Sequence, residues 1–208
     1  MFFINKTPVV ILSSPRTGSC ALGEYISNSF VPSIDYVNEP IRTDIQSFEI
    51  GNLTPYQYFW QNENIVAFMV HIHNKLPFVF KEHLINLQKY EKDLVKYISY
   101  DPTLFRIRLQ RKDTVKQIAS LFIARMRKKW FMSKEDLNIP YSVVMDDAML
   151  QECISFILAS NQALANTDIK FDLELYFEDL PELPNDIFML ETKPINYDEV
   201  IENVKKLI

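Results

Sequence analysis

A turn rich in basic, hydroxyl and glycine residues follows a short apolar run near the start of the sequence. The run PVVILSS, residues 8–14, is apolar and β-branched, which is typical of a buried strand. Residues 19–30 are typical of a helix, so the turn at residues 15–18 joins a strand to a helix. Free amides at a helix start, together with the helix dipole, favour negative charge. This layout predicts a site for a phosphate-like anion.

Each residue type in the turn would give such a site a different property. Arg16 supplies a positive charge and a fork of N–H donors, while Thr17 and Ser19 supply hydroxyl groups. Gly18 lets the backbone approach an anion closely. The turn is not a Walker A loop, because the first glycine and the lysine of G-x-x-x-x-G-K-[ST] are missing. The alternative is an ordinary connection between a strand and a helix.

A second junction of the same kind lies near the middle of the chain. Residues 104–111 are predicted to form a strand that ends in Arg111, and Asp113 is suited to cap a helix that runs to about Trp130. Ser120 follows Asp113 by about two helical turns. A second anion could therefore contact Arg111 and the Ser120 hydroxyl together. The alternative is a solvated strand end with a capping aspartate.

Strands and helices alternate along the rest of the sequence. We expect further strands at residues 34–38, 65–72 and 170–177, and further helices from Thr54, at 80–99, from Asp146 or Asp147 to about 165, and from Tyr197. This order predicts one α/β domain over residues 1–208, P-loop-like and three-layered, with a central, mainly parallel sheet flanked by helices. Ligands of such sheets bind beyond the carboxyl ends of the strands, where both junctions fall.

The composition narrows the classes of function. The 208 residues are 48% hydrophobic with a net charge of −5, which argues against a general nucleic-acid binder. Two cysteines are too few for a disulfide scaffold or a zinc site, and indicate a reducing compartment. The first residues do not resemble a signal peptide, and there is no apolar run of about 18 residues. We therefore expect a cytoplasmic protein that does not associate with a membrane.

Both junctions resemble elements of sulfotransferases that use 3′-phosphoadenosine 5′-phosphosulfate (PAPS), above all the bacterial trehalose-sulfotransferase-like family. PRTGSCAL, residues 15–22, resembles the family's P-R-S-G-S-T-x-L loop, with Cys20 in place of a hydroxyl residue. RKDTVKQIAS, residues 111–120, resembles its R-R-D-x-x-x-Q-A-x-S signature, with Lys112 in place of the second arginine. LYFEDL, residues 175–180, resembles a late Y-E-D-L element, for which we expect a structural role.

The resemblance implies an enzyme that moves a sulfuryl group from PAPS to a hydroxyl on a carbohydrate or small metabolite, with no metal required. Arg111 and Ser120 would bind the 3′-phosphate. Arg16 would also stabilise the leaving phosphate, because such reactions depend on positioning and charge stabilisation. Relatives often dimerise, so a homodimer is an open alternative. The residues implied to hold the 5′-phosphosulfate form the first loop: Pro15, Arg16, Thr17, Gly18, Ser19 and Cys20.

The base that accepts the hydroxyl proton has more than one candidate. We favour Glu39, which follows the strand predicted at residues 34–38 and resembles a family glutamate in a similar place. His71 and His73 are the rivals, because VHIHNKLP loosely resembles a K-T-H-L-P stretch whose histidine serves cytosolic sulfotransferases. Each of the three could instead be an ordinary loop or strand residue.

Two other functions stay open at this point. A nucleotide-dependent phosphotransferase would need magnesium ligands and a loop lysine, which the sequence does not offer in a recognisable pattern. A degenerate, non-catalytic relative would still bind a nucleotide. Cys20 in the first loop, and the lack of a basic glycine-containing motif after Leu190, keep this second alternative open.

Overall fold

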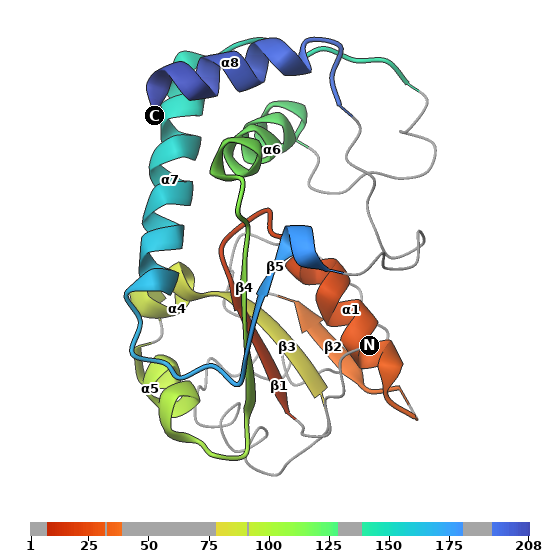
Figure 1. Cartoon of the computed structure of the whole chain (residues 1–208), viewed down its shortest axis with the longest axis vertical. Coiled ribbons are helices and arrows are strands. Elements are labelled where there is room, and N and C mark those ends of the chain that lie inside the picture. The colour runs from red at the N-terminus through yellow and green to blue at the C-terminus, as the bar shows by residue number, and fades with distance from the viewer. Residues whose placement is uncertain (1–7, 32, 39–77, 91, 129–138, 181–192) are drawn as a thin grey trace.

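The computed structural model describes residues 8–31, 33–38, 78–90, 92–128, 139–180 and 193–208 (Figure 1). A 3₁₀ turn at Phe177–Asp179 follows the last of the described strands. The elements are, in chain order, β1 (Val9–Ser13), α1 (Ser19–Ser29), β2 (Asp35–Asn38), β3 (Phe78–His83), α4 (Leu84–Tyr90), α5 (Lys92–Tyr100), β4 (Phe105–Gln110), α6 (Thr114–Arg127), α7 (Asp147–Ala165), β5 (Leu173–Tyr176) and α8 (Tyr197–Leu207).

The described strands form one five-stranded sheet in the order β2-β3-β1-β4-β5, and every pair in it is parallel. The predicted α/β fold with a central parallel sheet is confirmed. From β1 the chain leads to β2 at one edge, whereas from β4 it leads to β5 at the other edge. The sheet therefore has a switch point between the carboxyl ends of β1 and β4, which is where ligands bind in open α/β sheets.

Alternating side chains of the central strand build a core on each face of the sheet. Val9 and Ile11 pack with the apolar residues of α1, while Val10 and Leu12 pack with α4, α5 and α7. All five residues of β1 are buried, as expected for a strand covered on both faces. A third core joins α6, α7 and α8. Figure 1 shows α6 and α8 beyond the carboxyl ends of the strands, above the switch point.

Two helix starts were predicted correctly from their capping residues. The Asp113 carboxylate accepts a hydrogen bond of 2.9 Å from the amide of Lys116 in the first turn of α6. Asp146 does the same for Met149 at the start of α7, with a distance of 3.0 Å.

Within the ranges that the structure describes, no helix is both long enough and apolar enough to cross a membrane.

The helix predicted at residues 80–99 is wrong at its start. Residues 80–83 belong to β3, and the helical part begins at Leu84 and forms α4 and α5. Phe80 is fully buried within the sheet, next to Val10 of β1 in the pairing register, so tertiary packing overrides the local helical pattern. The strand predicted at 65–72 and the helix predicted from Thr54 lie outside the described residues.

Candidate functional site

The loop between β1 and α1 has a backbone shape suited to binding an anion. Arg16 has a φ of 62° and Gly18 a φ of 72°, both in the left-handed region. Left-handed residues among right-handed ones turn successive N–H groups toward one side and create a concave anion site. Gly18 adopts this shape without strain, whereas for Arg16 it costs about 1–2 kcal/mol. Neighbouring groups must therefore hold the loop in place.

Hydrogen bonds from three elements hold this loop. Within it, the Thr17 hydroxyl donates to the carbonyl of Ser14 at 3.0 Å. From α6, the Gln117 amide nitrogen donates to the Ser14 hydroxyl at 2.8 Å and to the Pro15 carbonyl at 2.6 Å. From the end of β4, Arg111 Nη1 donates to the Arg16 carbonyl at 3.2 Å. Thr17 is fully buried, so we assign its hydroxyl to holding the loop rather than to contacting a ligand.

The two predicted anion-binding junctions meet at the switch point. Arg16 Nε donates to the Ser120 hydroxyl at 2.9 Å, and Arg111 reaches the backbone of Arg16. The structure thus brings together the three residues that the sequence singled out at separate junctions. Arg16 is half-buried and Ser120 is buried, so the positive charges act where solvent screens them less. Two arginine side chains therefore belong to this one part of the molecule, one in the first loop and one bound to its backbone.

The 3₁₀ turn after β5 covers both junctions. A Cβ atom added to Gly18 would lie 2.7 Å from a ring carbon of Phe177, so this ring lies directly on the first loop. The guanidinium carbon of Arg111 lies 4.9 Å from the centre of the same ring, within cation–π range. The sequence predicted only a structural role for LYFEDL. In the fold this element contacts the glycine of one junction and the arginine of the other.

Glu178 of the same turn binds the start of the second junction. Its carboxylate accepts hydrogen bonds from the amides of Lys112 at 2.9 Å and Asp113 at 3.2 Å, and lies 3.8 Å from Arg111 Nε. Burial alone would raise the pKa of Glu178, but the two amide hydrogen bonds and the charge of Arg111 outweigh it and hold the pKa below its ordinary value. Glu178 is therefore ionised near neutral pH and fixes Arg111 from one side.

A buried lysine and histidine lie beside the first loop, at the carboxyl end of β3. His83 Nδ1 is 3.2 Å from the Ser13 hydroxyl and 3.3 Å from the Ser13 carbonyl, and His83 Nε2 is 3.2 Å from Lys81 Nζ. A protonated lysine only donates, so we assign the lone pair to Nε2 and the proton to Nδ1.

Sequence reasoning missed this pair because it placed residues 80–83 in a helix. The signal was present, since Lys81-Glu82-His83-Leu84 shares its Lys, His and Leu with the K-T-H-L-P stretch quoted above. Glu82, the residue between them, accepts a hydrogen bond of 2.7 Å from the amide of His83, the last residue of β3.

The structure describes some of the other predicted site residues and not others. Pro15 and Ser19 are buried and Cys20 is half-buried, all in or beside the loop. The predicted bases Glu39 and His73, and with them His71, lie outside the described residues.

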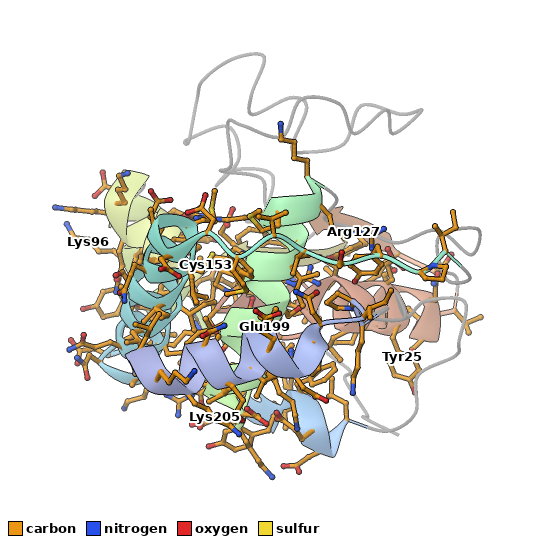
Figure 2. The ribbon with its side chains drawn as sticks, turned by 90° about the horizontal axis from the view of Figure 1, so that it is seen from above. Tyr25, Lys96, Arg127, Cys153, Glu199 and Lys205 are labelled. Carbon is orange, nitrogen blue, oxygen red and sulfur yellow. The ribbon has the colours of Figure 1, made fainter. Side chains whose placement is uncertain are left out.

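The far end of α6 is separate from the site. Arg125 pairs with Glu152 at 3.4 Å, and the guanidinium of Arg127 lies 3.8 Å from the ring centre of Tyr141. Figure 2 shows Arg127 at the end of α6, with α8, which carries Glu199 and Lys205, alongside α6 and α7. Cys153 is in the core between these helices, where burial raises the pKa of its thiol, and both cysteines are free.

The sequence was compared with family models and with curated proteins. No family model matches the sequence, and no curated protein sequence matches it. Among the described residues, no group of three or more histidine, cysteine, aspartate or glutamate side chains is arranged to hold a metal ion.

Proposed function

We propose that the chain is a cytoplasmic sulfotransferase that moves a sulfuryl group from PAPS to a hydroxyl on a carbohydrate or small metabolite. The observation that carries the proposal is the meeting of Arg16, Arg111 and Ser120 at the switch point of the sheet. Two anion-binding junctions at one crevice suit a nucleotide that carries negative groups on both sides of its ribose. PAPS has such groups at its 3′ and 5′ positions.

The first loop holds the 5′-phosphosulfate in this proposal. Its left-handed turns and the start of α1 provide N–H groups, and Arg16 provides positive charge. Arg111 and Ser120 bind the 3′-phosphate, with the start of α6 beside them. As the reaction proceeds, negative charge grows on the 5′-phosphate, and the same positive groups stabilise it.

His83 is the base that the geometry favours. The acceptor hydroxyl oxygen attacks sulfur, the bond between sulfur and the 5′-phosphate oxygen breaks, and the electron pair of that bond leaves with the nucleotide. His83 Nδ1 keeps its proton through its contacts with Ser13, Lys81 turns from His83 Nε2 to the leaving phosphate, and the hydroxyl proton passes to the Nε2 lone pair that Lys81 has vacated. Glu39 and His73, which lie outside the described residues, remain rival candidates for the base.

A thermal-shift experiment without magnesium tests the proposal. The chain should be stabilised by 3′-phosphoadenosine 5′-phosphate (PAP) and much less by adenosine 5′-phosphate, because only the former has a group for Arg111 and Ser120. Equal or greater stabilisation by Mg-ATP would contradict the proposal in favour of a phosphotransferase. Stabilisation by PAP with no transfer of radiolabelled sulfate to any hydroxyl acceptor would support a non-catalytic nucleotide-binding protein instead.

A further inference from the structure

A glutamine on α6 connects the two junctions through a fully buried side chain. Gln117 has no solvent exposure, and its amide nitrogen donates to the Ser14 hydroxyl and the Pro15 carbonyl at 2.8 and 2.6 Å. Its amide oxygen accepts a hydrogen bond of 3.1 Å from Asn161 Nδ2 on α7. Because the Pro15 carbonyl can only accept, the nitrogen end of the Gln117 amide must face the loop, and its oxygen is then left for Asn161.

The bonds that Gln117 and Arg111 make are to carbonyls at the turn itself. In a trans peptide the N–H points away from the C=O of the same unit. With the Pro15 carbonyl held by Gln117, the amide of Arg16 is turned away from α6. With the Arg16 carbonyl held by Arg111, the amide of Thr17 is turned away from that guanidinium. The left-handed φ of Arg16 lies between these two fixed peptides.

We propose that Gln117, backed by Asn161, is a positioning residue that sets the first loop in its anion-binding shape before a ligand arrives. Gln117 touches no ligand in this scheme. It acts by holding a strained turn, so that binding does not have to reorganise the backbone. The identity of the anion, the 5′ group of the nucleotide, rests on the proposed function. The order of the loop itself can be measured without any ligand.

Two variants and a control test this role. Gln117→Leu removes all three hydrogen bonds at similar volume, and Gln117→Glu keeps the oxygen that Asn161 binds but replaces the donor to the loop with an acceptor. Val200→Ala, in the buried face of α8, is the control for general loss of stability. Hydrogen exchange of the Arg16, Thr17 and Gly18 amides is measured together with the affinities for PAP and for adenosine 3′-phosphate.

Both Gln117 variants should speed exchange of the loop amides and weaken PAP binding roughly tenfold, as expected for a lost hydrogen-bond network. Affinity for adenosine 3′-phosphate should stay roughly within twofold of wild type, because its phosphate would bind Arg111 and Ser120 and not the amides of the first loop. Val200→Ala should change neither the exchange of the loop amides nor the affinity for either nucleotide. Unchanged loop exchange, or equal loss for both nucleotides, would overturn the inference. If wild type binds neither nucleotide, the proposed function fails, and loop exchange alone decides the role of Gln117.

Discussion

Arg16 Nε donates a 2.9 Å hydrogen bond to the hydroxyl of Ser120, a residue 104 positions later in the chain. The bond joins the loop after β1 to the helix after β4. It therefore sets how far apart an anion at the first junction and an anion at the second can lie. A ligand that bridges both junctions should depend on this bond more than either half of the ligand does.

Replacing Ser120 with alanine tests that dependence. Ser120→Ala removes the partner of Arg16 and a hydroxyl of the second junction, so PAP affinity should fall about tenfold, the typical effect of losing a hydrogen bond to a charged group. Titration calorimetry measures the affinity. Ser160→Ala is the matched control, because Ser160 is equally buried but bonds only to the Phe156 carbonyl within its own helix. Equal loss in both variants would contradict the role of Ser120.

Gly18 is predicted to tolerate no side chain. In Gly18→Ala the new Cβ would meet Phe177 at 2.7 Å, and the backbone φ of 72° would be strained as well. The strain alone costs about 1–2 kcal/mol, and the contact adds to it. Urea unfolding measures the decrease in the free energy of unfolding.

The double variant Gly18→Ala with Phe177→Ala separates the two causes. Removing the ring relieves the contact but leaves the strained φ, so alanine at position 18 should cost less in the Phe177→Ala background than in wild type. An equal cost in both backgrounds would show that Phe177 does not cover the loop in solution.

The carboxylate of Glu178 should make stability depend on pH. Its folded-state pKa lies below the ordinary value of 4.5, so its contribution is present above that pH and is lost as the pH falls through the folded pKa. Glu178→Gln should lower stability at pH 7 by about 1 kcal/mol, by analogy with a helix cap. Differential scanning calorimetry from pH 7 into acid should show the difference between wild type and variant shrinking.

Glu202→Gln is the control for this carboxylate. Glu202 pairs with Lys205 at 2.8 Å on the exposed face of α8, where such pairs contribute little to stability. A pH-dependent difference as large for Glu202→Gln as for Glu178→Gln would contradict the account of Glu178.

Mutation of His83 should separate catalysis from donor binding. His83→Gln should reduce kcat by about 10²–10⁴-fold, the usual contribution of a general base, while PAP affinity changes little. Radiolabelled transfer to a panel of hydroxyl acceptors measures the rate. Glu39→Gln is assayed beside it, and a large rate loss for Glu39→Gln with none for His83→Gln would assign the base to Glu39.

The sequence was enough to predict the frame of the site but not the residues that support it. The strand-to-helix junctions at Pro15–Gly18 and Arg111–Asp113 were found because apolar runs, turns and caps are local signals. In a parallel sheet, two junctions at the carboxyl ends of strands lie at the same edge. The meeting of Arg16 with Ser120 then required only that β1 and β4 be neighbours, which they are.

Residues whose role depends on a distant partner could not be found in this way. Gln117 matters because its side chain joins the first loop to Asn161 of α7, and Glu178 matters because β5 places it over the start of α6. Asn161 is 44 residues from Gln117, and Glu178 is 65 residues from Asp113 at the start of α6. His83 was missed for a different reason. Residues 80–99 are periodic and charged on one side, which suits a helix, and only the pairing of β3 with β1 shows that residues 80–83 belong to the sheet.

The ratio of affinities for PAP and adenosine 5′-phosphate, measured by titration for wild type and Arg111→Ala, tests the central claim most directly. Wild type should prefer PAP, and Arg111→Ala should lose about 10- to 100-fold of that preference, as expected for a charge-assisted contact, with adenosine 5′-phosphate binding reduced far less. If Arg111→Ala keeps the full preference for the 3′-phosphate, the second junction does not bind it and the account is contradicted.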